Sequence, residues 1–204
     1  MIVLQLRFPR PLRLVSMRWV VTVLTCLLGM PGLAAGEGRP VLVVGDSLAR
    51  GLQPTLGSLI APRRLVWDVD GGRTTPEGIV RLRADLRSVR PAAVLISLGT
   101  NDGPHADRFR ARIRRALGAI PAGVCIVWAD LDRPPRKGPY RAMNAELARA
   151  ARHDRRLVVV HWHHAVATHR VDLPDQIHPD PAGFAYRSRL FARALEGGCA
   201  TLAP

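Results

Sequence analysis

Short apolar runs alternate along the chain with segments in which apolar residues recur every three or four positions. The apolar runs predict five buried strands, at 41–44, 65–69, 93–98, 124–128 and 157–162. The periodic segments predict helices between and after them, at 47–60, 76–89, 107–120, 140–153 and 181–195. Strands that are apolar throughout and alternate with helices indicate a parallel sheet with helices on both faces.

The expected fold is therefore α/β, a three-layer α/β/α sandwich on a five-stranded parallel sheet. In such sheets ligands bind beyond the carboxyl ends of the strands. Polar or glycine-rich motifs follow the first three predicted strands, at 45–48, 69–78 and 99–103. We expect these motifs to meet at one edge of the sheet.

The first 35 residues carry four arginines and no acid, followed by an uncharged run at 19–30 and the small residues of Ala34 and Ala35. This order predicts a secretory signal peptide over residues 1–35, which places the protein in the periplasm or outside the cell. The alternative is a retained anchor helix, but Pro31 and Gly32 interrupt the apolar run well before the roughly 20 residues that a span needs. Residues 36–204 then form one domain.

The formal charge of the chain is +14, and 26 basic against 16 acidic residues, or +10, remain beyond residue 35. The arginines are scattered over several predicted helices with few aromatic residues between them, which argues against nucleic-acid binding. Contact with an anionic membrane surface is compatible with this charge. We expect a monomer.

Ser47 stands at the junction of the first predicted strand and helix, where its hydroxyl is exposed at the carboxyl edge of the sheet. A serine needs a base to become a nucleophile. His178 and Asp175, three residues apart just before the last helix, offer a base and the carboxylate that orients it. The alternative is that the segment 175–178 is only a polar turn.

Acyl transfer also needs hydrogen-bond donors for the developing oxyanion. The N–H groups of Ser47 and Gly72 and the side-chain amide of Asn101 are the expected donors, since each follows one of the first three strands. Because Gly71 precedes Gly72, either glycine can be the donor. Arg73 would place a cation near the site.

Together, "GDSL" at 45–48, a glycine in "GGRT", "GTND" at 99–102 and "DQIH" at 175–178 resemble the four sequence blocks of the SGNH, or GDSL, hydrolases. Within that family the chain is most similar to the bacterial periplasmic thioesterase I, lysophospholipase and arylesterase group. The similarity lies in its size, in "GTNDG" at 99–103, in "NAEL" at 144–147 and in the predicted signal peptide. The resemblance implies a flavodoxin-like sandwich, Ser47 as nucleophile, His178 as base, Asp175 as its orienter, and an oxyanion hole of Ser47, Gly72 and Asn101. It implies no metal and no organic cofactor.

The function expected from these residues is an exported serine esterase that cleaves acyl-lipid, lysophospholipid, aryl or alkyl esters, or thioesters, through an acyl-enzyme. An O-acetyl esterase or acyltransferase acting on a carbohydrate or cell-wall polymer is the alternative, and a non-catalytic binding module is less favoured.

The histidines at 161, 163, 164 and 169 suggest zinc only weakly, because their spacing matches no recognised metal site. Trp128 and Tyr140 are candidates to line a substrate groove. Cys125 and Cys199 can form a disulfide or remain thiols.

Overall fold

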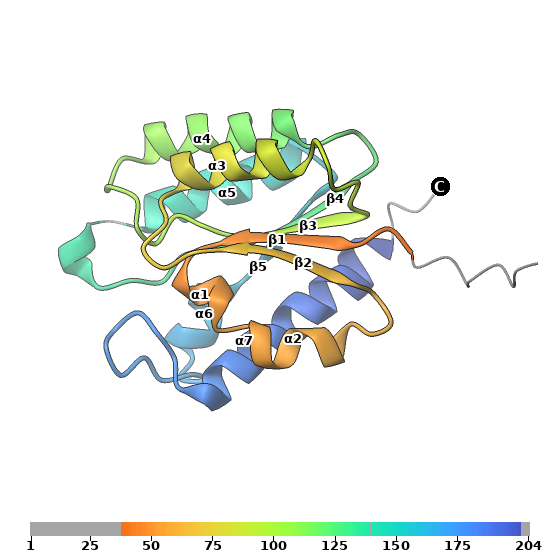
Figure 1. Cartoon of the computed structure of the whole chain (residues 1–204). Helices are drawn as coiled ribbons and strands as arrows, with labels where there is room; N and C mark the ends of the chain where they lie inside the picture. Colours follow the sequence, from red (N-terminus) through yellow and green to blue (C-terminus); the bar gives the residue numbers. More distant parts are fainter. Residues whose placement is uncertain (1–37, 139, 201–204) are drawn as a thin grey trace, which may run out of the picture. The chain divides into compact units, whose positions relative to one another are not determined.

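The computed structural model describes residues 38–138 and 140–200 (Figure 1). Its five strands are β1 (Val41–Gly45), β2 (Leu65–Val69), β3 (Ala93–Ser97), β4 (Cys125–Ala129) and β5 (Leu157–Val160). All pair in parallel, in the order β2-β1-β3-β4-β5. This is the strand order of flavodoxin-like sheets, and it confirms the predicted fold. The predicted signal peptide, residues 1–35, lies outside the described residues.

Helices cover both faces of the sheet (Figure 1). One face carries α3 (Thr75–Asp85), α4 (Ala106–Ala119) and α5 (Arg141–His153). The other carries α1 (Ser47–Arg50), α2 (Gln53–Leu59), α6 (Trp162–Ala167) and α7 (Pro181–Arg193), and α7 continues into the short π-helix η2 (Ala194–Gly198). The short 3₁₀ turn η1 (Pro135–Lys137) lies in the loop after β4. None of the described helices is long and apolar enough to cross a bilayer.

Strand alternation divides the core into two clusters. Leu42 and Val44 of β1 face α3, α4 and α5, whereas Val41 and Val43 face α2 and α7. The predicted helical stripes are buried against the first face, through Ile79 and Leu82 of α3, Phe109 and Ile113 of α4, and Met143 and Leu147 of α5. Burying each large apolar side chain contributes about 1.5–3 kcal/mol.

Three predicted boundaries are wrong. The helix expected at 47–60 is broken into α1 and α2 just before Pro54, because a proline has no N–H to continue the helix and its ring clashes with the preceding turn. The helix expected at 76–89 ends at Asp85. The last strand ends at Val160 rather than at residue 162, and the chain turns into α6 with Trp162 fully buried. At the end of β5, the burial of Trp162 in α6 overrides the local apolar pattern.

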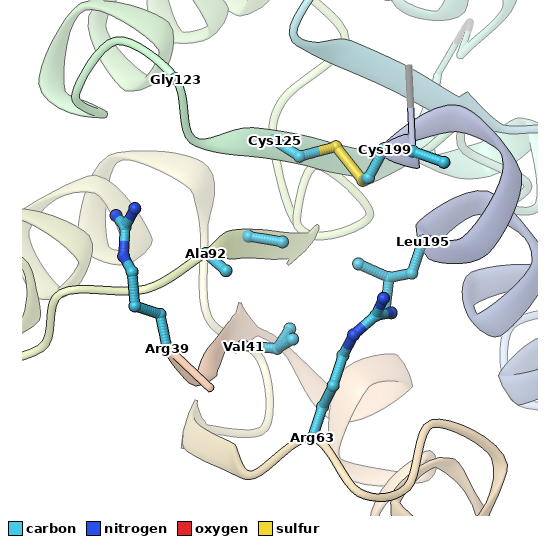
Figure 2. Close-up of a pocket in the computed structure, with 10 residues that line it drawn as sticks. Arg39, Val41, Arg63, Ala92, Gly123, Cys125, Leu195 and Cys199 are labelled. Carbon is cyan, nitrogen blue, oxygen red and sulfur yellow. A yellow bond between two sulfur atoms is a disulfide. The ribbon is translucent and has the colours of Figure 1, made fainter. Parts of the chain in front are cut away.

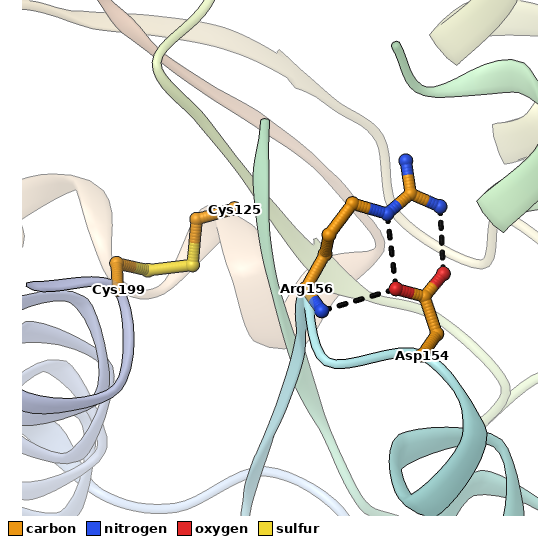
Figure 3. Close-up of a disulfide and its surroundings, with 4 residues drawn as sticks. All are labelled: Cys125, Asp154, Arg156 and Cys199. Atoms are coloured by element: carbon orange, nitrogen blue, oxygen red, sulfur yellow. Dashed lines mark hydrogen bonds and ion pairs between the residues drawn. A yellow bond between two sulfur atoms is a disulfide. The ribbon is translucent and has the colours of Figure 1, made fainter. Parts of the chain in front are cut away.

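Cys125 and Cys199 form a disulfide, which decides between the two possibilities left open by the sequence (Figure 3). The bond joins the start of β4 to the residue after η2, across a sequence separation of 74. Nearby, the Arg156 guanidinium donates to both carboxylate oxygens of Asp154, at 2.9 and 2.6 Å (Figure 3). Hydrogen bonds from Arg156 hold the pKa of Asp154 below its usual value.

A hollow of about 270 Å³ lies beside this disulfide, at the amino ends of β1, β3 and β4 (Figure 2). Arg39 and Arg63 stand on opposite sides of it (Figure 2). The Arg39 guanidinium donates to the carbonyl oxygens of Arg90 and Pro91 at 3.3 and 2.6 Å. None of the predicted functional residues lines this hollow, since they gather at the opposite ends of the strands.

Replacing both Cys125 and Cys199 by serine should lower the free energy of unfolding by about 2–4 kcal/mol, because the disulfide restricts the unfolded chain. Urea unfolding followed by circular dichroism measures the change. The wild-type protein should lose the same amount in reductant, whereas the double variant should be insensitive to reductant. Equal stability of the two proteins without reductant would contradict this.

Candidate active site

Ser47 lies at the point where β1 turns into α1. The turn needs Gly45, since a Cβ there would lie 2.9 Å from the carbonyl oxygen of Ser97 and 2.3 Å from the Ala49 Cβ. Asp46 then caps α1, its Oδ1 accepting from the N–H of Leu48 at 3.0 Å. As the first residue of α1, Ser47 has no acceptor within the helix for its own N–H.

Ser47, His178 and Asp175 are joined by hydrogen bonds. The Ser47 Oγ lies 2.7 Å from the His178 Nε2, and the His178 Nδ1 lies 2.7 Å from the Asp175 Oδ2. With Nδ1 donating to the carboxylate, Nε2 is the acceptor that faces the serine hydroxyl. The structure therefore brings together the three residues that the sequence predicts as nucleophile, base and orienter.

The turn around Asp175 holds this line of groups in place. The Asp175 Oδ1 accepts from the backbone N–H groups of Ile177 and His178 at 2.9 and 2.6 Å, and Gln176 has a positive φ of 67°. Hydrogen bonds from the ring and the N–H of His178 hold the pKa of Asp175 well below its usual range. The carboxylate thus stays charged beside the ring, although its side chain is 57% exposed and that of His178 is 38% exposed.

Two of the predicted oxyanion donors lie on the loops after β2 and β3. Gly72 has a φ of +75° and open space around its Cα, and no hydrogen bond occupies its N–H among the described residues. The Asn101 Nδ2 donates to the carbonyl oxygen of Arg73 at 3.2 Å and to the Asp46 Oδ2 at 3.4 Å. Asn101 thereby ties the loop after β2 to the cap of the helix that carries Ser47.

Arg133, which the sequence did not predict as a site residue, binds the loop that carries Asn101. Arg133 is buried, and its Nη1 donates to the carbonyl oxygens of Gly99, Thr100 and Asp102 at 3.2, 3.1 and 2.6 Å. Gly99 has a φ of +120°, and a Cβ there would lie about 3 Å from Leu131 and Phe109. An arginine within a proline-rich loop gives no sequence signal for this role.

Asp102 fixes the other side of the same loop. Its Oδ1 accepts from the backbone N–H of Thr75 at 2.8 Å, and its Oδ2 forms an ion pair with Arg112 at 2.6 Å. Asp102 therefore links the third motif to the start of α3 and to α4. These contacts hold the loop that presents Asn101 in one conformation.

Other expectations have different outcomes. Trp128 was expected to line a groove, but it is fully buried and its indole N–H donates to the carbonyl oxygen of Leu98 at 3.1 Å, so that prediction is wrong. Arg73 does lie near the site, since it donates to the carbonyl oxygen of Gly45 at 3.3 Å, but its charge is paired with Asp68 at 2.7 Å. It is therefore not a free cation.

Two of the four histidines, His161 and His163, lie against carboxylates. The His163 Nδ1 lies 2.5 Å from Asp132, and His161 lies 3.6 Å from Asp130. Among the described residues, no three histidine, cysteine or acidic side chains group as a metal site would require. The ring of Tyr140 packs edge-on against that of His163, with centroids 5.2 Å apart.

Two hollows flank the predicted site residues. One, of about 490 Å³, contains Gly71 and Gly72 in its wall together with the exposed Val80. The other, of about 300 Å³, lies next to the His178 segment and is lined by Pro134, Pro135, Tyr140, Val166, Leu173, Gln176, Asp132 and Arg133. Arg136 and Gln176 join its two walls by a hydrogen bond of 2.8 Å. Of the predicted site residues, Gly72 lines the first hollow, whereas Ser47, Asn101 and His178 line neither.

Comparison with known proteins places this geometry in a family. The family model of the GDSL-like Lipase/Acylhydrolase family matches residues 43–186. A search of curated proteins found no match.

Several solved structures share the fold. The C-terminal catalytic domain of Streptococcus pneumoniae peptidoglycan O-acetyltransferase A (OatA) is 16% identical, with a TM-score of 0.68 over 80% of this chain and 96% of that one. TesA is 24% identical, with a TM-score of 0.63 over 81% of this chain and 100% of that one. The psychrotrophic esterase EstA from Pseudoalteromonas sp. is 18% identical, with a TM-score of 0.61 over 78% and 97%. At these identities the three structures support the fold alone.

The family model spans the region from β1 into α7, which contains Ser47, Gly72, Asn101, Asp175 and His178. Both the motifs and the fold therefore lead to the same assignment. The chain belongs to the GDSL-like lipase/acylhydrolase family and is an SGNH-type enzyme that hydrolyses ester bonds.

Proposed function

We propose that the protein is an exported serine esterase that acts through an acyl-enzyme, with Ser47 as nucleophile, His178 as base and Asp175 as its orienter. The observation that carries this proposal is the pair of 2.7 Å hydrogen bonds that join Ser47, His178 and Asp175. A binding module of the same fold would have no use for this arrangement. No metal or organic cofactor enters the proposed mechanism.

In the first half-reaction the Ser47 Oγ attacks the ester carbonyl carbon while the His178 Nε2 takes its proton. The carbonyl oxygen becomes an oxyanion, for which the N–H groups of Ser47 and Gly72 are donors. The Asn101 amide is the third donor, and to act as one it must release one of its two present acceptors, Asp46 or Arg73. Collapse expels the alcohol or thiol, which receives the proton from His178. Water then repeats the sequence, releasing the acid and restoring Ser47.

For the substrate we propose a carboxylic ester or thioester of an acyl lipid, lysophospholipid or aryl or alkyl group. The hollow beside the His178 segment supports this, since prolines, Tyr140, Val166 and Leu173 give it an apolar wall. Its volume of about 300 Å³ is at the small end for ligand pockets. The polar groups of Asp132 and Gln176 in the same wall support the alternative, an O-acetylated carbohydrate or cell-wall polymer as substrate or acceptor.

We further propose that the protein works in the periplasm or outside the cell as a monomer, without nucleic acid. The disulfide between Cys125 and Cys199 supports this location, because disulfides persist in oxidising compartments. The charge of +10 beyond residue 35 favours contact with an anionic membrane surface, where acyl lipids are found.

Hydrolysis of p-nitrophenyl esters from acetate to palmitate tests the reaction. Ser47→Ala should reduce turnover at least about 10³-fold, because the nucleophile is lost. Ser58→Ala is the matched control, since the Ser58 hydroxyl is exposed on α2 and donates only to the Thr55 carbonyl, and it should retain wild-type rates. Equal turnover by the Ser47→Ala and wild-type proteins would refute the serine mechanism, and the chain-length optimum separates acetyl from lipid esters.

Asn101→Ala should lower kcat by about 10²–10³-fold with little change in KM, because an oxyanion donor acts mainly in the transition state. Steady-state kinetics with p-nitrophenyl acetate measure the effect, and thermal unfolding checks that the fold is retained. A raised KM with unchanged kcat would instead make Asn101 a substrate-binding residue.

The full chain expressed in a bacterial host should be recovered from the periplasm or medium with its amino terminus at residue 35 or 36. Amino-terminal sequencing and mass spectrometry measure this, and a chain that begins at residue 36 should stay in the cytosol. Recovery of the uncleaved 22.3 kDa chain in the membrane fraction would show a retained anchor instead.

A further inference from the structure

A hollow of about 470 Å³ lies between β5, α6 and α7, elements on or beside one face of the sheet (Figure 1). Its walls come from the end of β5, from α6 and the turn after it, and from α7 and the start of η2. β5 is the last strand of the sheet, so the hollow lies at the sheet's edge. Ser47, Asp175 and His178 do not line it, and the mechanism proposed above makes no use of it.

Four basic residues line this hollow, and none of the described residues in its wall is acidic. All four are exposed to solvent. They are His161 after β5, His164 in α6, Arg170 after α6 and Arg193 at the end of α7. Asp130, which is not part of the wall, lies 3.6 Å from the His161 ring, and no carboxylate lies as close to the two arginines within the described ranges.

The two arginines of the hollow are unpaired. Neither the Arg170 nor the Arg193 side chain forms a hydrogen bond or an ion pair with any residue in 38–138 or 140–200. In the hollow beside Gly72 the arginines are instead neutralised, since Arg73 and Arg81 both pair with Asp68 at 2.7 Å. The hollow between α6 and α7 therefore carries uncompensated positive charge, which attracts anions.

The turn after α6 holds Arg170 beside His164. His169 has a positive φ of 53°, and the backbone N–H of Arg170 donates to the carbonyl oxygen of Ala165 at 2.9 Å. This hydrogen bond closes a Schellman motif at the end of α6. Because Ala165 follows His164 in α6, the motif fixes the backbone of Arg170 next to the helical turn that carries His164.

α7 presents the second arginine on the same face as a tyrosine. Tyr186, Leu190 and Arg193 recur at spacings of four and three, so they share one face of the helix. The Tyr186 hydroxyl forms no hydrogen bond within the described part of the chain and is available as a donor. Leu190 and Val160 add apolar wall between the polar groups.

A phosphate group suits this set of side chains. A guanidinium presents paired N–H groups that match two phosphate oxygens, and two arginines match the charge of a phosphate monoester. The imidazole and phenol groups offer donors for the remaining oxygens. A carboxylate has one charge and only two oxygens, so it would leave much of this wall unused. The volume of about 470 Å³ is within the usual range for ligand sites.

We propose that the hollow between β5, α6 and α7 is a binding site for a phosphate group, with Arg170 and Arg193 as its principal ligands. The phosphate belongs either to a small soluble phosphate or to the headgroup of an anionic phospholipid, since both present the same charged oxygens. The site is separate from the triad and does not require ester hydrolysis.

Titration with inorganic phosphate at constant ionic strength tests the site, with the histidine rings followed by ¹H–¹³C NMR. The ring signals of His161 and His164 should shift and saturate, whereas that of His153, at the end of α5 on the other face of the sheet, should not. The double variant Arg170→Gln/Arg193→Gln should weaken binding at least about tenfold, because both charge-assisted contacts are lost.

Arg108→Gln/Arg115→Gln is the matched control. It removes the same two charges from exposed positions of α4, on the opposite face of the sheet, and binding should stay within about twofold of the wild-type value. Circular dichroism checks that each variant is folded, and the single variants Arg170→Gln and Arg193→Gln give the same test if the double variant is not. Neither readout involves ester turnover, so a failure of the serine mechanism would leave this test intact.

Co-sedimentation with vesicles identifies the source of the phosphate. Binding to phosphatidylglycerol vesicles but not to phosphatidylcholine vesicles, lost in Arg170→Gln/Arg193→Gln and kept in the control, would support the site with a lipid headgroup as ligand. Saturable shifts with inorganic phosphate and no vesicle binding would support it with a soluble phosphate. Absence of binding to both probes, or an equal loss in the two double variants, would overturn the proposal.

Discussion

The buried carboxylate of Asp46 is the group on which the arrangement of the site depends. It caps α1 through Leu48 and accepts from Asn101 on the loop after β3. A single side chain thus connects the end of β1 with the first turn of α1 and the loop after β3. The cost of burying it is offset by polar contacts that also fix the geometry around Ser47.

A second group of contacts comes from the loop after β4. Arg133 holds the carbonyl oxygens of the loop that carries Asn101, and Arg136 bonds to Gln176 beside the His178 segment. One loop therefore contacts both the loop of a predicted oxyanion donor and the loop of the predicted base. A change in this loop would therefore affect the positions of both Asn101 and His178.

The sequence predicts much of this structure because its signals are local. Four apolar residues followed by Gly-Asp-Ser indicate a strand that turns into a helix, and the spacing of Asp175 and His178 predicts their shared face. The break between α1 and α2 also has a local signal, since Gly51 and Pro54 lie there, whereas the packing of Gly51 against Phe184 is not visible in the sequence. The buried positions of Trp128 and Arg133 were missed because they depend on contacts with residues far away in the chain. Tertiary packing creates their buried environments. In most proteins an arginine is exposed, and a tryptophan is rarely buried completely.

The disulfide has a consequence for damage by proteases. Asp175 and His178 lie within the covalent loop that Cys125 and Cys199 close, and Ser47 lies before it. A single cut in the surface loop after β4 would separate Ser47 and His178 into two polypeptides that the disulfide still joins. The nicked molecule would remain one covalent unit, with its strands and helices free to stay packed. Where peptidases are abundant, the backbone can therefore be cut in this loop while both parts of the site stay in one covalent molecule.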